Sequence, residues 1–433
     1  MPLHQQKHFK LFSPQTDSLN KQFFLSITLQ KKLLRLDSKI VIVYLSDMKI
    51  VHHKDKISIR ITQLIVLGFL AATALSSCQS HPPKNSTSSS TTALTSVSQV
   101  TKQSSEISIM EFNVENLFDT KHDVNREDYT FLPRTEKSKP EVKAYCLAQN
   151  SAHRREECFE TDWNEDVVKI KLQHLGEVIR FVDQGNGPDN LMLEEVENIS
   201  ILKQLVSQEL STLGYQTVVL IEGPDTRGID PAFISKFPLS KSKPPQLHLI
   251  PYTDSNPEQL KWAQKSRGIL EVTVQTPQKK DLTFLIAHFP SQQNPTAWRK
   301  QAVQFAKNLM ADYEKAGRAV IFGGDLNISR DEETEEGFFK KELSQVGQVS
   351  HMIGCQNCLG SHNYKGEWSF LDALIFSNNL ATSGYEVIPE SIEVVRTKNH
   401  LKRNGSPKGF RAENKEGVSD HLPLYSRLRP TLK

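Results

Sequence analysis

The feature of this sequence that most constrains its fold is a series of short apolar runs spread over residues 106–428. Each run is rich in Val, Ile, Leu and Phe and is bounded by Gly, Pro, Asn or Asp, which is typical of β-strands. In chain order the runs are EISIMEFNV, NLMLEEV, YQTVVLI, PAFIS, LHLIPY, GILEVTVQ, LTFLIAHF, RAVIFGGD, LDALIFS, SIEVVR and LPLYSRL. The fold therefore has to accommodate eleven strand candidates.

Helical spacing appears in only a few of the segments between these runs. Apolar residues recur every three or four positions in 166–183, and similar spacing appears in 200–213 and in 297–312. Eleven strands with so few helices are too many for a simple alternating parallel sheet. The pattern predicts an α/β sandwich, in which two sheets stack and helices cover their outer faces. No internal repeat or obvious domain break follows Ile107, so we expect one folded domain over 107–433.

The charge of the chain is distributed unevenly. Residues 1–78 carry 11 Lys and Arg against 4 Asp and Glu, whereas residues 79–433 carry 42 against 46. The basic character of the whole sequence therefore belongs to its front part. The remaining body has no overall positive charge that would by itself indicate nucleic-acid binding.

The order of segments near the front predicts an export signal. A cationic stretch, Lys49–Arg60, leads into the apolar ITQLIVLGFLAATAL, which is short for a membrane span. The following Leu75-Ser76-Ser77-Cys78 resembles the lipobox of bacterial lipoproteins. We expect a lipoprotein-type signal peptide over 48–78 with Cys78 as the lipidated residue. A plain cleaved signal and an uncleaved anchor are the alternatives.

Signals of this kind begin close to their cationic stretch, so we expect Met48 to be the true start and residues 1–47 to be a doubtful upstream extension. Residues 79–106 are rich in Ser and Thr without apolar periodicity, which predicts a flexible tether. The expected location is the cell envelope, the periplasm or the cell surface, with a lipid anchor holding the protein to a membrane. Secretion is the alternative.

An exported body can form disulfides, and its cysteines are even in number. Two local bridges are expected, Cys146–Cys158 and Cys355–Cys358. A zinc site at Cys355 and Cys358 with nearby histidines is the rival interpretation. The disulfide is preferred, because a structural zinc site usually needs a second closely spaced pair of ligands.

Polar residues interrupt the apolar runs or stand directly at their ends. A charge in such a place has to be paired, hydrated or bound to a metal. Seven such places in one fold indicate one shared polar site. The residues are Asn113, Glu115, Glu194, Glu195, Asp230, His288, Asp325, Asn327, Asp372, Asp420 and His421.

The motifs that contain these residues are FNVENLF, LEEVEN, RGID, AHFPS, GGDLN, FLDALIFS and SDHLPL. This ordered set resembles the endonuclease/exonuclease/phosphatase superfamily, from about Ile107 to Pro430. The superfamily includes pancreatic-type deoxyribonucleases, repair endonucleases, inositol-polyphosphate 5-phosphatases and neutral sphingomyelinases. The resemblance implies a four-layered α/β/β/α sandwich of two mainly antiparallel or mixed sheets with outer helices. It also implies hydrolysis of phosphate esters with a divalent cation, usually Mg²⁺, with Mn²⁺ or Ca²⁺ as alternatives.

The resemblance assigns roles to the acidic residues that would hold the cation. Glu195 matches the main metal-binding glutamate of the family, and a carboxylate is the oxygen ligand that Mg²⁺ prefers. Glu115 falls where many members have an acidic residue that helps to hold the metal. Asp420 matches an acidic residue often assigned to a second metal or to water.

The resemblance also assigns the residues that would act on the substrate. Asp325 would orient or deprotonate the attacking water, while Asn327 contacts the phosphate and Asn113 matches the asparagine of the first motif. His421 matches the terminal histidine of the family, and Asp372 matches the aspartate that orients it.

A second histidine of pancreatic-type enzymes is matched by His288, and Asp230 is our candidate for its partner. Two positions depart from the family pattern. Glu194 replaces a common glutamine, and its charge either strengthens metal binding or faces away. Ile328 stands where an acidic residue often follows the asparagine.

Two loops adjoin these motifs. Residues 396–418 hold seven Lys and Arg against two Glu and lead directly into the last motif. This basic loop either contacts a phosphate backbone or is simply solvated. The charged segment 120–165 is expected to be an inserted surface loop, with a lid over the site as the alternative.

The leading functional hypothesis is a metal-dependent phosphodiesterase acting as a nuclease on DNA or RNA. A phosphatase or a phospholipid or sphingomyelin phosphodiesterase is the second enzymatic interpretation. A catalytically silent binding lipoprotein of the same fold is the alternative outside enzymes. The protein is expected to be a monomer.

Overall fold

The computed structural model describes residues 23–36, 39–52, 61–65 and 99–431, and it divides into two compact units, Met1–Ser90 and Thr91–Lys433. The first unit contains an antiparallel sheet of β1 (Phe23–Leu36), β2 (Lys39–His52) and β3 (Ile61–Ile65). Part of the expected signal segment 48–78 falls in β2 and β3, whereas Cys78 and most of the expected tether lie outside the described residues. No helix within the described ranges is long and apolar enough to cross a membrane.

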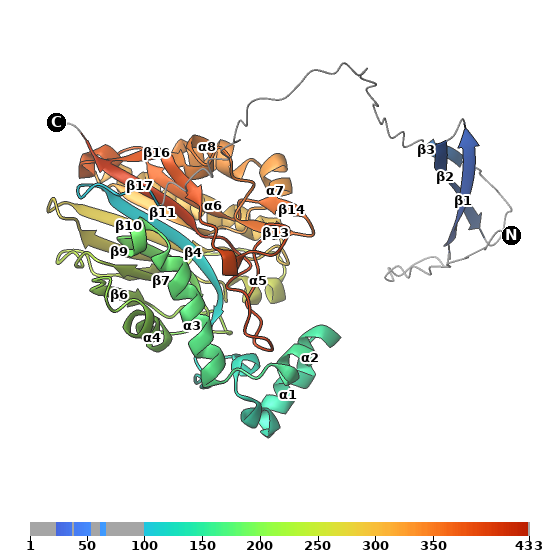
Figure 1. The fold of residues 1–433 in the computed structure, drawn as a ribbon, viewed down its shortest axis with the longest axis horizontal. Helices are drawn as coiled ribbons and strands as arrows, with labels where there is room; N and C mark the ends of the chain where they lie inside the picture. Colours follow the sequence, from blue (N-terminus) through green and yellow to red (C-terminus); the bar gives the residue numbers. More distant parts are fainter. Residues whose placement is uncertain (1–22, 37–38, 53–60, 66–98, 432–433) are drawn as a thin grey trace, which may run out of the picture. The chain divides into compact units, whose positions relative to one another are not determined.

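The second unit is built on two six-stranded sheets (Figure 1). Sheet one has the order β16-β17-β4-β5-β7-β6, and sheet two has the order β12-β15-β11-β10-β9-β8. Both are mixed, because β4 pairs parallel with β5 and β10 pairs parallel with β11 while their other pairs are antiparallel. The strands of sheet one are β4 (Ile107–Leu117), β5 (Asn190–Val196), β6 (Thr217–Leu220), β7 (Asp230–Ser235), β16 (Tyr385–Val394) and β17 (Leu424–Pro430). Those of sheet two are β8 (Gln246–His248), β9 (Ile269–Gln275), β10 (Asp281–His288), β11 (Val320–Asp325), β12 (Gly347–Val349) and β15 (Asp372–Ser377).

Three apolar cores separate four layers, which confirms the expected α/β/β/α sandwich. One core joins sheet one to α3 (Glu165–Arg180) and α4 (Ile199–Glu209), which begin after the side-chain caps of Asn164 and Asn198. A second core lies between the inner faces of the two sheets. The third joins sheet two to α6 (Thr296–Lys315).

Shorter elements complete this unit. The helices are α5 (Pro257–Ala263), α7 (Arg330–Glu335) and α8 (Ser350–Ile353), and a small hairpin is formed by β13 (His362–Tyr364) and β14 (Glu367–Ser369). Short 3₁₀ turns span Tyr129–Phe131, Arg134–Ser138, Asp183–Gly185, Leu343–Gln345, Leu380–Ser383 and Lys398–His400, and a π turn spans Phe338–Glu342.

The segment 120–165 corrects one expectation, because it is not a plain surface loop. It contains α1 (Pro140–Ala148) and α2 (Ala152–Glu160), which project beyond the sandwich in Figure 1. The Cys146–Cys158 disulfide joins the two helices and belongs to a small apolar cluster of their own. Both expected disulfides are confirmed, since Cys355 is also bonded to Cys358.

Candidate active site

The alternation of side chains along the strands places four polar groups at one edge of the sandwich. On β4, Ile109 faces the space between the sheets, and so does every second residue up to Asn113. The same alternation carries the inner face of β10 to His288 and that of β11 to Asp325. Asp372, at the start of β15, pairs directly with Asp325 across the sheet. Apart from Glu111 on β4, the inner faces of these strands are apolar or glycine up to the edge where the four polar residues converge.

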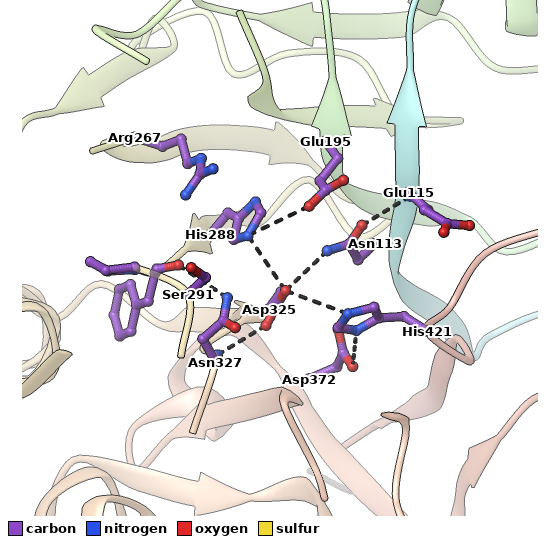
Figure 2. Close-up of polar contacts among 12 residues, drawn as sticks. Asn113, Glu115, Glu195, Arg267, His288, Ser291, Asp325, Asn327, Asp372 and His421 are labelled. Carbon is purple, nitrogen blue, oxygen red and sulfur yellow. Dashed lines mark hydrogen bonds and ion pairs between the residues drawn. The ribbon is translucent and has the colours of Figure 1, made fainter. Parts of the chain in front are cut away.

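His421 lies between two buried aspartates (Figure 2). Its Nδ1 is 2.8 Å from Asp372 Oδ2 and 3.0 Å from Asp372 Oδ1, and its Nε2 is 3.8 Å from Asp325 Oδ2. Ser419 fixes the start of this segment, because its hydroxyl donates to Asn113 O and accepts from the His421 backbone N–H. The Asp372 contact orients the imidazole so that its Nε2 faces the site.

Electrostatics favour a charged His421. Burial opposes its protonation, but Asp372 and Asp325 outweigh burial and raise the pKa of His421 well above its usual value. Burial disfavours the charged form of Asp325 and raises its pKa to about 7, although the neighbouring His421 charge acts to lower it. Asp325 can therefore exchange a proton near neutral pH, which suits a group that receives a proton from water.

Two asparagines hold Asp325 in place. Asn113 Nδ2 donates to Asp325 Oδ2 at 3.0 Å, and the Asn327 backbone N–H donates to Asp325 Oδ1 at 2.9 Å. Asn327 has a φ of 52° and donates its side-chain amide to Phe289 O. Gly324 precedes Asp325 with a φ of 131°, and a Cβ there would overlap the carbonyl oxygen of Ala287. The GGDLN motif thus depends on a glycine at this position.

The expected cation ligands stand on irregular backbone. The pairing of β4 with β5 shifts register between Asn113 and Leu117, and the pairing of β5 with β7 shifts between Leu193 and Val196. Glu115 and Glu195 lie in these irregularities with φ values of 51° and 64°. Glu195 Oε2 accepts from the Asn116 backbone N–H at 3.0 Å, and Oε1 lies 3.9 Å from His288 Nε2.

Glu115 is held by the basic loop 396–418. Its Oε2 accepts a hydrogen bond of 2.6 Å from the Phe410 backbone N–H, and Figure 2 shows its carboxylate turned away from Glu195. Burial and the Asp420 carboxylate raise the pKa of Glu115 to about 8. This contact attaches the basic loop to the end of β4.

Lys171, on α3, is a buried cation that sequence reasoning missed. Its Nζ donates to Glu115 O at 2.9 Å and to Val418 O at 2.6 Å, and it lies 5.0 Å from the centre of the Phe410 ring. Burial lowers its pKa to about 8, although Glu115, Asp420 and Glu195 act in the opposite direction. A signal existed in the sequence, since Lys171 falls within the apolar stripe of the helix over 166–183.

The donor set fits a divalent cation. The acidic groups of Glu115, Glu195 and Asp420 all act on the ammonium of Lys171, and the pKa of Glu115 is itself raised to about 8. Carboxylate oxygens are the ligands that Mg²⁺ prefers. Within the described part of the chain, two sets of potential ligands have donor atoms within 4.8 Å of one another, and both include His421. The sets are His362, Asp420 and His421, and Asp325, Asp372 and His421. Of the three expected ligands, Asp420 belongs to one of these sets, whereas Glu115 and Glu195 belong to neither.

His288 and Asp230 are not paired in the structure, which corrects one expectation. Asp230 Oδ1 accepts from the Gly223 backbone N–H, whereas His288 Nδ1 is buried and has no hydrogen-bond partner among the described residues. His288 Nε2 instead faces Asp325 Oδ2 at 3.5 Å. Burial, together with the charges of Arg267 and Arg227, lowers the pKa of His288 well below its usual value. A neutral His288 therefore adjoins a charged His421.

Glu194 points away from the expected cation position. It shares the inner face of β5 with Met192 and lies beside Glu111 of β4, between the two sheets. Burial raises the pKa of both carboxyl groups well above the usual range, and so does the nearby Asp372. Of the two readings of Glu194, the structure supports a residue that faces away from the cation.

The inserted segment borders the His288 side of the site. Arg154 of α2 donates to Gln293 Oε1, which follows β10, and Glu127 contacts Thr226 in the loop before β7. Phe410 of the basic loop packs edge-on against Trp163, at the end of the insertion. The two loops singled out in the sequence therefore flank the same edge of the sandwich.

The fold and site define a phosphate-ester hydrolase with a histidine-and-carboxylate centre. A family model for the endonuclease/exonuclease/phosphatase family matches residues 148–430, and the chain belongs to this family. The match includes Glu195, His288, Asp325, Asp372 and His421 and begins after β4. The members of the family are hydrolases that act on phosphate esters and generally use a divalent metal.

Several solved structures are similar to this chain. TDP2 from C. elegans is 13% identical with a TM-score of 0.44, covering 75% of each chain. A family protein from Bacteroides thetaiotaomicron is 12% identical with a TM-score of 0.45, covering 76% of this chain and 99% of that one. The mannosyl-6-phosphatase Bt3783 of Bacteroides thetaiotaomicron VPI-5482 is 12% identical with a TM-score of 0.44, covering 74% and 99%. Comparison with curated proteins finds no match.

Proposed function

We propose that this chain is a divalent-cation-dependent phosphodiesterase that acts on nucleic acid. The observation that carries the proposal is the buried series Asp372–His421–Asp325, which faces the carboxylates of Glu195 and Asp420 at one edge of the sandwich. A phosphodiester is anionic and repels hydroxide, so its hydrolysis needs positive charge, a positioned water and a proton acceptor. This edge supplies each of these functions through a different residue.

Asp325 accepts the proton of the attacking water while the water oxygen bonds to phosphorus. Its pKa of about 7 and its two asparagine contacts suit this role. The charged His421 donates Nε2–H to a phosphate oxygen, while Asp372 keeps its imidazole oriented. A cation held by Glu195 and Asp420 would neutralise the phosphate and stabilise the departing oxygen.

The basic loop favours a polyanionic substrate over a small one. It holds seven Lys and Arg against two Glu, and Glu115 attaches it beside the cation ligands. A phosphate backbone in contact with this loop would release counterions, so binding should weaken steeply with salt.

The test uses the purified full chain with Mg²⁺, with and without a chelator, on plasmid DNA, RNA and bis-p-nitrophenyl phosphate. The His421→Ala variant is the control. Chelator-sensitive cleavage of nucleic acid that requires His421 would support the proposal. Cleavage of the small diester alone would redirect the search to lipids and nucleotides, and no cleavage of any substrate would favour the silent binding protein.

A further inference from the structure

Arg267 is a buried cation at the edge of the site with an unused hydrogen-bond donor. It lies just before β9, and only 7% of its surface is exposed. Its Nη2 is 3.1 Å from Asp225 Oδ2, but its buried Nε has no partner among the described residues. Figure 2 shows the guanidinium directed toward His288. A buried N–H without an acceptor is unfavourable, and the Nε groups of Arg318 and Arg427 are left in the same way. Arg267 differs from these two arginines because its guanidinium is directed at the catalytic residues.

Arg267 shares its carboxylate partner with a second arginine. Asp225 also faces Arg227, whose Nε lies 3.9 Å from Asp225 Oδ1, so one carboxylate serves two guanidinium groups. His288 is the next polar group toward the catalytic centre, and both arginines disfavour its charged form. Two guanidinium groups therefore act on His288 from one side, while the Glu195 carboxylate lies 3.9 Å from His288 Nε2.

We propose that Arg267 is a substrate-positioning residue that binds a phosphate oxyanion on the His288 side of the site. The guanidinium is a planar group of fixed donors, and it suits the oxygens of a phosphate. The oxyanion belongs either to the phosphate being cleaved or to the adjacent phosphate of a nucleic acid strand. This inference rests on the proposed function, since it names the part of the substrate that the same site holds.

The first test measures binding of inorganic phosphate to the full chain by isothermal titration calorimetry, without any turnover. Arg267→Met should weaken binding about 10- to 100-fold, as expected for a lost hydrogen bond between charged groups. Arg267→Lys keeps the charge but not the planar set of N–H donors, so it should give a smaller loss of phosphate affinity. If the methionine variant does not fold, the lysine variant still tests the inference.

Arg318→Met is the matched control. Arg318 is a partly buried arginine paired with Glu271, and its Nε likewise has no partner among the described residues. It precedes β11 at the end opposite Asp325. Its replacement removes the same charge from the same sheet and should leave phosphate affinity within twofold of the original chain. If both folded Arg267 variants also bind phosphate within twofold of the original chain, the inference is wrong.

The second test separates the two sources of the oxyanion. It compares KM and kcat on the dinucleotide TpT, which has one phosphate, and on its 5′-phosphorylated form. Equal losses on both substrates assign Arg267 to the cleaved phosphate, and a loss only on the phosphorylated form assigns it to the neighbouring one. If the original chain binds phosphate in an Arg267-dependent manner but cleaves nothing, the proposed function fails and the binding site stands. If the original chain cleaves nucleic acid but the Arg267 variants bind phosphate as tightly as the original chain, only this inference fails.

Discussion

The two sheets build their shares of the active site in different ways. Sheet two delivers His288, Asp325 and Asp372 from regular strand ends, with Asp325 and Asp372 directly opposite each other. Sheet one delivers Glu115 and Glu195 from interrupted pairings, on backbone with positive φ. Such backbone costs about 1–3 kcal/mol per residue and persists only where surrounding contacts hold it. Here Lys171 and the Phe410 amide provide such contacts to Glu115, and the Asn116 amide provides one to Glu195.

The difference separates two chemical tasks. The regular side holds buried groups whose pKa values are set by burial and by one another, and under the proposed function it would transfer protons. The irregular side turns the Glu115 and Glu195 carboxylates out of the strand alternation, and under the proposed function Glu195 would hold a cation. We therefore expect substitutions on the two sides to fail in different ways.

The largest effect is expected from His421→Ala. Loss of a charged donor that faces the phosphate should lower kcat about 10³-fold. Added cation should not restore the activity, because the lost group donates a proton to the phosphate and does not bind the cation. Circular dichroism and thermal unfolding should show a folded protein. Recovery of activity at high Mg²⁺ would contradict the division between the two sides.

Lys171→Met should affect stability more than chemistry. Removal of the ammonium leaves buried carbonyls and carboxylates without their partner, which should cost about 3–5 kcal/mol in the free energy of unfolding. A bound cation should recover part of this loss by mass action. The measurement is thermal unfolding with and without Mg²⁺, and the increase in Tm should exceed that of the original chain.

Lys137→Met is the control for this prediction. Lys137 donates to Tyr129 O and Thr130 O, and burial lowers its pKa to about 8, as for Lys171. It lies in the insertion, away from the three carboxylates. An equal increase in Tm with Mg²⁺ in both variants would show that the ammonium of Lys171 does not offset the negative charge of the site.

Glu195→Gln should weaken cation affinity about 10- to 100-fold, within the range seen when metal sites lose supporting groups. Activity should return as the Mg²⁺ concentration rises. In Asp325→Asn the cation dependence should remain while kcat stays low at every concentration. The two Mg²⁺ titrations, run on the same substrate, measure this contrast. Identical Mg²⁺ titration curves for the two variants would contradict the division between a cation-binding and a proton-transferring side.

Within one pH unit of neutrality, the pH dependence should be the smallest of these effects. Asp325 must be deprotonated to accept a proton, so kcat/KM should rise about tenfold per pH unit below its pKa of about 7 and level off above it. His421 stays charged over this range, since its pKa is raised. The profile is measured from pH 5 to 8.5 with bis-p-nitrophenyl phosphate, which does not titrate there. Activity that falls with pH in this range would refute the assignment of Asp325 as base.

Much of this arrangement could be predicted from the sequence, because strand alternation is local. Once LTFLIAHF and RAVIFGGD are assigned to inner strands, His288 and Asp325 must stand at their ends. The pairing of His288 with Asp230 failed, since closeness in motif order does not give distance in space. Glu111 and Glu194 are separated by 83 positions and meet only through the parallel pairing of β4 and β5. The bulges that redirect Glu115 and Glu195 leave no periodic signal.

The inserted segment leaves and re-enters the sandwich at neighbouring points. Trp163 Nε1 donates to Phe118 O at 3.1 Å, and Thr120 Oγ1 donates to Glu165 Oε1 at 2.6 Å, so its ends are already joined. Its disulfide and apolar cluster hold the rest together. An inserted segment whose ends are joined in this way can be lengthened, shortened or exchanged without changing the register of either sheet. Selectivity for substrates can therefore diverge between related chains while the hydrolytic machinery stays constant.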